Sequence, residues 1–125
     1  KMIDFDNALF IKLSQVSNST YAQYVDLLLT SGEEIITTYK GIRDGVVFTN
    51  KRIISINVQG ITGSKKDFTI LPYSKIQAFS VETAGSLDLD GELDLYFSGL
   101  GHVRFEFARG TNMAGLCAII SEHML

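Results

Sequence analysis

The sequence has few of the residue types that usually carry out chemistry. Its 125 residues include one cysteine, Cys117, one proline, Pro72, two histidines and no tryptophan. A lone cysteine excludes an internal disulfide and suits a reducing compartment, so we expect a cytoplasmic protein. No apolar run approaches the roughly 20 residues that a membrane-spanning helix requires. A chain of this size without a linker-like tract is expected to form one compact domain around one core.

Charge is unevenly distributed along the chain, whose formal net charge is −3. Asp4 and Asp6 stand where a secretory signal would be basic, so the sequence predicts no export. Residues 40–75 carry seven bases and two acids, a net +5, whereas residues 82–94 carry five acids and no base, a net −5. Two such segments could attract each other between copies of the chain, or neutralise each other within one fold.

The first thirty residues predict two helices. One begins at Asp4 or Asp6, whose side chains suit an N-cap, and extends to Val16. The second is predicted over 21–29, where apolar residues recur at helical spacing, and Gly32 ends it. The N-terminal quarter is therefore expected to be a helical extension.

Alternating apolar and polar residues after Gly32 predict seven strands separated by turns. Asp44-Gly45 and Asn50-Lys51 are expected to form two tight hairpin turns, and 60–66 a longer loop. A C-terminal helix is predicted from Met113, where apolar residues again recur at helical spacing, capped by Thr111 or Asn112. The strands are predicted over 35–42, 46–49, 52–58, 68–71, 76–83, 87–97 with a turn or bulge at 90–91, and 103–107.

Seven strands in one open sheet would expose two edges and an apolar face, so two packed sheets or a partly open barrel are expected. The sequence resembles the bacterial pleckstrin homology (PH) family, a set of uncharacterised prokaryotic proteins. The motifs that carry the resemblance lie in the middle of the chain: Gly32-Glu33-Glu34, Arg43-Asp44, Phe48-Thr49-Asn50-Lys51-Arg52-Ile53, Gly60-Ile61-Thr62-Gly63, Pro72-Tyr73, Glu82-Thr83-Ala84-Gly85, Leu87-Asp88-Leu89-Asp90 and Glu92-Leu93.

The expected fold is thus mainly β: a PH-like, seven-stranded, partly open barrel of two packed antiparallel sheets. A C-terminal helix caps the barrel, and a helical extension precedes it. We expect the extension over residues 1–31 and the PH-like domain over residues 32–125. The resemblance implies self-assembly into closed rings and implies no enzymatic activity.

Metal, cofactor and nucleophile sites find little support in the sequence. Asp88, Asp90, Glu92 and Asp94 lack the spacing of a calcium loop, and at period two they share one strand face. His102 and His123 lie in different elements, without Cys or acidic neighbours at the spacing of zinc ligands. Cys117, on the apolar side of the last helix, is expected to be a buried, inert thiol. No cofactor is expected.

Anion and nucleic-acid binding are also disfavoured. The familiar inositol-phosphate site of the PH superfold uses a long basic first hairpin, whereas this hairpin has only Lys40 and Arg43 and carries Asp44 at its tip. The chain is acidic overall, and its aromatic residues do not alternate with bases along one strand face, so no nucleic-acid partner is expected.

The leading interpretation is a non-enzymatic β-domain that assembles through its sheet edges and N-terminal helices into a closed homo-oligomer, a pentamer or larger. Such an oligomer would present a surface to an unknown protein partner. The predicted interface combines apolar positions of the second helix with opposite charges: Tyr21, Tyr24, Leu28, Lys51, Lys65, Lys66, Asp88, Asp90 and Asp94.

Two other functions are weighed against that interpretation. The alternative is peripheral binding to anionic membrane lipid through Lys65, Lys66 and the N-terminal helix around residues 9–11. A small-molecule site in the barrel mouth would need convergent polar groups, and the sequence identifies none.

Overall fold

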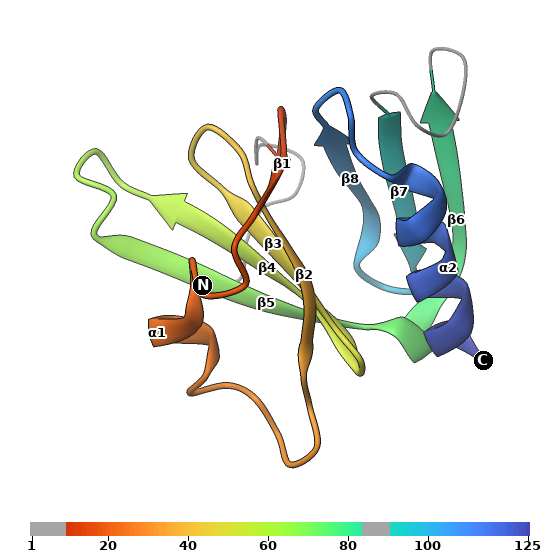
Figure 1. The fold of residues 1–125 in the computed structure, drawn as a ribbon, viewed down its shortest axis with the longest axis horizontal. Helices are drawn as coiled ribbons and strands as arrows, with labels where there is room; N and C mark the ends of the chain where they lie inside the picture. Colours follow the sequence, from red (N-terminus) through yellow and green to blue (C-terminus); the bar gives the residue numbers. More distant parts are fainter. Residues whose placement is uncertain (1–9, 84–90) are drawn as a thin grey trace.

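The computed structural model describes residues 10–83 and 91–125, and over these ranges the chain is mainly β (Figure 1). The predicted seven strands and C-terminal helix are confirmed as β2 to β8 and α2, and a further short strand, β1, precedes them. Residues 87–90 of the predicted strand 87–97, with its turn or bulge at 90–91, lie outside the described residues. In chain order the elements are β1 (Ser14–Val16), α1 (Ala22–Val25), β2 (Ile35–Lys40), β3 (Gly45–Thr49), β4 (Arg52–Gln59), β5 (Lys65–Pro72), the 3-10 turn η1 (Tyr73–Lys75), β6 (Ile76–Thr83), β7 (Gly91–Phe97), β8 (Gly101–Phe107) and α2 (Met113–Met124).

The strands form two antiparallel sheets, one with the order β1-β2-β3-β4-β5 and one with the order β6-β7-β8. Successive side chains of a strand point to opposite faces, so the register assigns each residue to a face. In the larger sheet Ile53 lies opposite Leu71 on the inner face, while Ile54 lies opposite Ile70 on the outer face. The sequence pattern of the central strands is apolar on both faces, and both faces of that sheet are in fact covered.

The main core lies between the inner faces of the two sheets, and α2 packs over one end of it (Figure 1). Met113, Leu116 and Ile120 of α2 are buried at the spacing of one helical face. The helix begins at Asn112, whose Oδ1 accepts a hydrogen bond from the Gly115 backbone N–H at 2.9 Å. Of the two predicted caps, Asn112 is therefore the one used.

A second cluster of buried side chains covers the outer face of the larger sheet, so the expectation of a single core was wrong. Val47, Ile54 and Ile56 supply the sheet side of this cluster, and Tyr21 and Val25 pack on them from α1 and the residue before it. Burying one such aliphatic side chain contributes roughly 1.5–3 kcal/mol. The segment around α1 is thus held to the sheet by apolar contacts.

The predicted first helix is wrong over its described part, residues 10–16. Here the chain is extended: residues 14–16 pair with β2, and residues 10–13 run beside β8. The Leu13 N–H donates to the Glu106 carbonyl at 3.0 Å, and the Glu106 N–H donates to the Phe10 carbonyl at 2.8 Å. Phe10 and Leu13 are buried in the main core. Burial and a strand partner outweigh the helical spacing of these residues, because propensity is a weak prior.

The predicted second helix is much shorter than the stretch 21–29. Only Ala22–Val25 is α-helical, although Tyr21 and Val25, four residues apart, still face the sheet as the spacing predicted. Because Phe10, Leu13, Tyr21 and Val25 all enter the cores, the N-terminal segment packs closely on the barrel. The boundary between residues 1–31 and 32–125 stays a prediction.

The barrel is partly open, as predicted, and the opening lies between β5 and β6. Residues 10–16 link β8 to β2 and close the seam on the opposite side. Within the described residues, β5 pairs only with β4 and β6 pairs only with β7. The two sheets and residues 10–16 therefore form one open barrel whose two free edges are β5 and β6.

Candidate functional site

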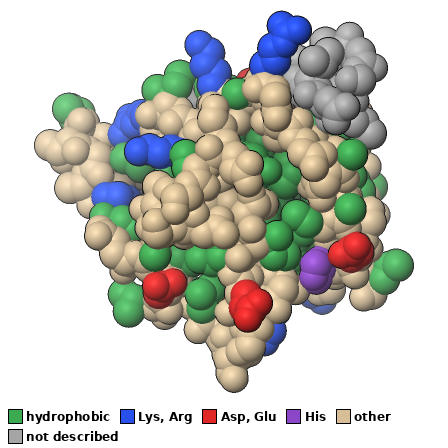
Figure 2. Space-filling view, in the orientation of Figure 1, with side chains coloured by type: hydrophobic (Ala, Val, Ile, Leu, Met, Phe, Trp, Pro, Cys, Tyr) green, Lys and Arg blue, Asp and Glu red, His purple; other side chains and the backbone are tan. Residues whose placement is uncertain are grey.

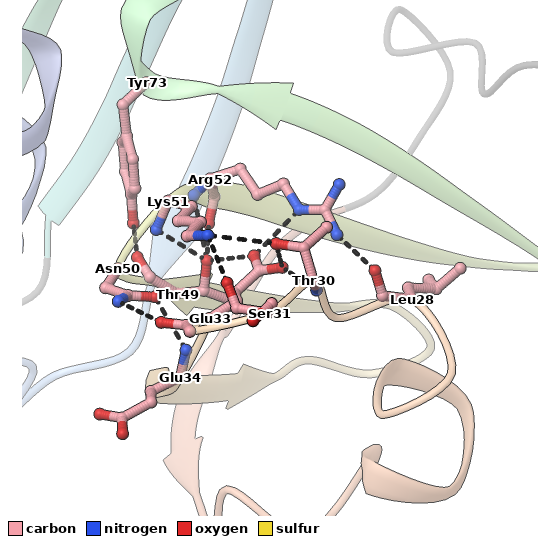
Figure 3. Close-up of polar contacts among 11 residues, drawn as sticks. Leu28, Thr30, Ser31, Glu33, Glu34, Thr49, Asn50, Lys51, Arg52 and Tyr73 are labelled. Carbon is pink, nitrogen blue, oxygen red and sulfur yellow. Dashed lines mark hydrogen bonds and ion pairs between the residues drawn. The ribbon is translucent and has the colours of Figure 1, made fainter.

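An ion pair between Glu33 and Arg52 joins the loop before β2 to the start of β4 (Figure 3). The Glu33 side chain is inaccessible to solvent, and its Oε2 accepts hydrogen bonds from Arg52 Nε at 2.9 Å and from Thr49 Oγ1 at 2.6 Å. Its Oε1 accepts from the Thr30 N–H at 2.9 Å. Burial alone would raise the pKa of Glu33, but these donors and the Arg52 charge lower it to about 2.

The side chains of Asn50 and Lys51 complete this group, and we call residues 30–34 with 49–52 the Glu33 cluster. Asn50 Oδ1 accepts from the Glu34 N–H at 2.8 Å, and Asn50 Nδ2 donates to the Gly32 carbonyl at 3.0 Å. Lys51 Nζ donates to the Ser31 carbonyl at 2.7 Å. Two motifs that carry the family resemblance therefore meet in one place and bind each other. The Glu33 cluster therefore stabilises the fold by holding the loop before β2 against the turn between β3 and β4.

The free edges of β5 and β6 offer backbone groups to a partner. Each strand is eight residues long, and η1 turns the chain so that the two strands separate instead of forming a hairpin. Within residues 10–83 and 91–125, the outward-facing backbone groups of these edges have no strand beside them. Unpaired edges are ready templates for pairing with another chain.

Two neighbouring hairpin tips each expose an apolar side chain. Ile42 is 66% exposed at the tip between β2 and β3, and Ile61 is fully exposed at the tip between β4 and β5. Arg43 Nη2 donates to the Gly60 carbonyl at 2.8 Å and so ties the two tips together. Asp44 points inward and accepts from the Val58 N–H at 2.8 Å, so its carboxylate is almost fully buried.

The outer face of β7 and β8 carries a polar group built on Asp94. This residue is only 4% exposed, and its Oδ1 accepts from Arg104 Nε at 2.9 Å and contacts His102 Nε2. His102 also stacks on Tyr96, with ring centroids 5.0 Å apart. Burial opposes ionisation of Asp94, yet the hydrogen bonds from Arg104 and His102 hold its pKa below the ordinary value.

A cavity of about 700 Å³ lies where β6 and β8 end and β7 begins. Its lining mixes two bases, Lys12 and Arg109, with three carboxylates, Glu82, Glu92 and Glu106, that face one another across the three strands. The bases and carboxylates of this wall do not select one class of ligand. The lining of this cavity therefore gives no support to the hypothesis of a small-molecule site in the barrel mouth.

The apolar residues predicted at an interface lie on or near α1. Tyr21 is buried, and Tyr24 packs on Phe68 with ring centroids 5.9 Å apart and with Lys66 Nζ 5.2 Å from its own ring. Leu28 is 37% exposed. Of these three, Leu28 offers the most surface to a partner, and an interface role for the set stays a prediction.

The charged residues predicted at an interface divide into three groups. Lys51 and Lys65 are exposed, and Lys66 is half-buried. Asp94 is already paired within its own chain. Asp88 and Asp90 lie outside the described residues. Among the acids of the net −5 segment that the structure describes, Glu82 is the one exposed on a free edge strand, which sequence reasoning did not single out.

Metal and thiol chemistry find no site in the part of the chain that the structure describes. No group of three His, Cys, Asp or Glu residues there could hold a metal ion. Cys117 is half-buried on α2, and burial raises the pKa of its thiol, so the thiolate is disfavoured. His123 stacks on Tyr73. Within the same described ranges, no helix is long and apolar enough to span a bilayer.

Comparison with known sequences gives one family. The family described as bacterial PH domain matches residues 4–124. The uncharacterised protein YjqA of Bacillus subtilis is 42% identical over 95 residues, which are 76% of each chain. The uncharacterised protein YozO of the same organism is 36% identical over 109 residues, 87% of this chain and 94% of YozO.

Solved structures agree with that family. A DUF1696 family protein with a PH domain from Shewanella loihica PV-4 has a TM-score of 0.79 and 37% identity, covering 92% of this chain and 99% of that protein. A PH domain from Shewanella amazonensis SB2B has a TM-score of 0.67 and 40% identity, covering 90% and 91% of the two chains. Both likenesses cover at least nine tenths of this chain.

Proposed function

Because the chain belongs to the bacterial PH domain family, we propose that it is a non-enzymatic interaction module that assembles with copies of itself into a closed ring. The observation that supports this proposal is the pair of free strand edges, β5 and β6, at the opening of the barrel. Two different edges make a heterologous contact, and heterologous contacts close into rings or run on as filaments.

The ring would display a repeated surface to an unknown protein partner. The outer face of β6 to β8 suits that role, because Tyr96, His102 and Arg104 lie exposed on it, and Tyr and Arg are enriched at protein interfaces. Cytoplasmic placement and the absence of a nucleic-acid partner stay predictions.

The native mass of the purified chain tests the ring. We expect a discrete species of about five or more copies, since a closed ring has a fixed copy number. Backbone pairing and apolar contacts resist salt, so the mass should persist from low to moderate ionic strength. Native mass spectrometry and sedimentation would measure it. A monomer at every concentration would overturn the proposal.

A second candidate function, binding to an anionic membrane surface, is favoured by the hairpin tips. Ile42 and Ile61 are exposed and linked through Arg43, and Lys40 and Lys65 lie in the adjoining strands. In the face of the molecule drawn in Figure 2, Lys and Arg side chains lie mainly in the upper part, and Asp and Glu side chains lie mainly in the lower part. Apolar side chains beside bases suit a bilayer interface.

This candidate places the membrane-binding apolar residues elsewhere than the sequence predicted, which was the N-terminal helix around residues 9–11. Phe10 is buried in the main core and so is not free to enter a membrane. Lys65 remains exposed, while Lys66 is half-buried beside Tyr24. The hairpin tips replace the N-terminal helix as the inserted element.

Sedimentation with vesicles of phosphatidylserine and phosphatidylcholine tests this second candidate. We expect binding to the anionic vesicles to fall strongly in an Ile42→Ser/Ile61→Ser variant. Leu27→Ser is the matched control, because Leu27 is 86% exposed but lies beside Leu28, whose carbonyl binds Arg52 at the end of β4 opposite the tips. Equal binding of both variants, or no binding of the parent chain, would remove the membrane role.

A further inference from the structure

The connection between β1 and β2, residues 17–34, lies over the outer face of the larger sheet, and we call it the covering segment. One end follows β1, which pairs with β2, and the Glu33 cluster holds the other end. Between these ends, residues 17–29 make only local backbone–backbone hydrogen bonds within the described chain, such as that from the Val25 N–H to the Tyr21 carbonyl at 2.9 Å. Figure 1 shows the stretch from α1 to β2 as a long loop. The middle of the covering segment is thus attached to the sheet through side-chain contacts.

Two buried polar atoms between the covering segment and the sheet have no hydrogen-bond partner among the described residues. They are the hydroxyl of Tyr21, in the covering segment, and Oγ1 of Thr38, on the outer face of β2 opposite Val47. Tyr21 is 7% exposed, and Thr38 is fully buried. A buried polar atom without a partner costs free energy, and exposure to water removes that cost. The closed position of the covering segment is therefore less favourable than its apolar contacts alone would make it.

The apolar surface on the outer face is larger than the helix that covers it. Ile54 and Ile56 of β4 lie under the covering segment, and the apolar surface continues onto β5, where Ile70 lies opposite Ile54 and Phe68 opposite Ile56. Phe68 and Ile70 are only half-buried. Two strand spacings separate β3 from β5, roughly 10 Å, whereas the single turn of α1 rises about 5.4 Å. A longer helix would cover more of this face than α1 does.

We infer that this outer face is a docking surface for an amphipathic helix of a partner protein, and that the middle of the covering segment moves aside to admit it. The covering segment itself indicates the occupant, because it presents Tyr21 and Val25, four residues apart, to the sheet. A helix with apolar side chains at positions i, i+4 and i+7 makes the same contact and also reaches Phe68 and Ile70. The inference does not depend on the ring, since this face is distinct from the free edges of β5 and β6.

The covering segment would then control the affinity for that helix. An apolar surface left open in water promotes aggregation, so the closed position protects the free chain. A surface that is covered most of the time binds its partner more weakly, in proportion to the fraction of molecules in which it is open. A change that loosens the covering segment should therefore strengthen binding of the helix. A surface that is always accessible would show no such gain.

Thiol labelling of two neighbouring valines measures the opening. In a Cys117→Ala background, Val47→Cys places a thiol under the covering segment, whereas Val46→Cys places one in the main core. Both valines are almost fully buried and adjacent on β3, so the two variants are a matched pair. After correction for global stability measured in urea, we expect N-ethylmaleimide to label Val47→Cys at least about tenfold faster, because Val46→Cys reacts only after global unfolding.

A second matched pair on β4 repeats the measurement, so the test survives if one variant does not fold. Ile54 lies in the second cluster and Ile53 in the main core, and both are fully buried. Ile54→Cys should again be labelled faster than Ile53→Cys. Adding Tyr21→Ala should accelerate labelling of the two outer-face thiols about tenfold, and should change the inner-face thiols only as far as global stability changes. Equal labelling rates within both pairs would overturn the inference.

A synthetic peptide with the sequence of residues 17–31 serves as the helix probe for docking. We expect this peptide to slow the labelling of Val47→Cys, and to bind a Tyr21→Ala chain at least about fivefold more tightly than the parent chain, because the face is open more often. The same peptide carrying Tyr21→Ala and Val25→Ala is the matched control and should give no protection. Fast labelling without protection by the first peptide would overturn the docking surface. Equal protection by both peptides would also overturn it, since the apolar spacing would then not matter.

Discussion

The two sheets treat their outer faces in opposite ways. The larger sheet carries Val47, Ile54 and Ile56 outward, and the segment around α1 covers them. The smaller sheet carries Asp94, Tyr96 and the residues paired with them outward, and none of the described elements covers that face. An apolar outer face needs a covering segment, whereas a polar one can stay in water. The difference leaves the smaller sheet with the polar outer face, which carries the exposed Tyr96, His102 and Arg104.

The largest expected effect comes from breaking the covered face. Ile54 is fully buried in the second cluster, so Ile54→Ala should lower the free energy of unfolding by about 3–4 kcal/mol, through lost transfer energy and a cavity. Tyr96→Ala, a large-to-small change on the open face, should cost less than about 1 kcal/mol. Urea unfolding followed by circular dichroism measures both. Similar losses for the two variants would contradict the comparison.

The next effect concerns the ion pair that ends the covering segment. The pKa of Glu33 is about 2 in the folded chain and near 4.5 in the unfolded chain. The ionised carboxylate therefore stabilises the fold at pH values above the pKa of the unfolded chain. That stability is lost as the pH falls from about 4.5 through about 2. A shift of this size corresponds to about 3 kcal/mol at neutral pH. Unfolding measured between pH 7 and pH 2 should show this loss.

Two variants assign that acid sensitivity to Glu33. In Glu33→Gln the pH-dependent contribution should disappear, and the chain should be less stable at pH 7. Glu34→Gln is the control, because the Glu34 side chain is exposed and the residue takes part in the Glu33 cluster through its backbone N–H and carbonyl. An unchanged acid profile in Glu33→Gln would mean that another carboxylate governs it.

A smaller effect tests how closely the covering segment approaches the larger sheet. A Cβ at Gly45 would clash with the ring and hydroxyl of Tyr21, so Gly45→Ala should cost about 2 kcal/mol by overpacking. In a Tyr21→Ala background the same change should cost much less, because the clash is gone. The double-mutant cycle measures this coupling by thermal unfolding. Equal costs in the two backgrounds would show that Tyr21 does not press on β3.

Much of the fold could be predicted because alternation reports the faces of a strand directly. Each of the seven predicted strands overlaps an observed one, although β5 begins at Lys65, inside the predicted loop 60–66. The residues 10–16 could not be predicted. Their apolar spacing fits a helix, but β8 and β2 offer two edges that satisfy their backbone. Local sequence cannot report partners that lie far away along the chain, as β8 and β2 do.

The candidate site was less predictable than the fold, for a related reason. Charge counts pointed to acids between 82 and 94, but which of them is free depends on pairing: Arg104 takes Asp94, while Glu82 stays exposed on an edge. Ile61 carried a usable signal, since an isoleucine between Gly60 and Gly63 is unexpected in a loop of turn residues, and the structure leaves it fully exposed. Free edges are a property of topology, so only the structure could locate them.

The smallest expected effect refines the open face of the smaller sheet. Arg104 and His102 hold the pKa of Asp94 below its ordinary value, so Arg104→Gln should raise that pKa, by removing one charge and one donor. Because Arg104 is half exposed, the fold itself should keep nearly its full stability. An NMR titration of the Asp94 carboxyl carbon measures the shift. If the pKa of Asp94 does not move, the contact with His102 is enough to hold the carboxylate ionised, and Arg104 adds little to the open face.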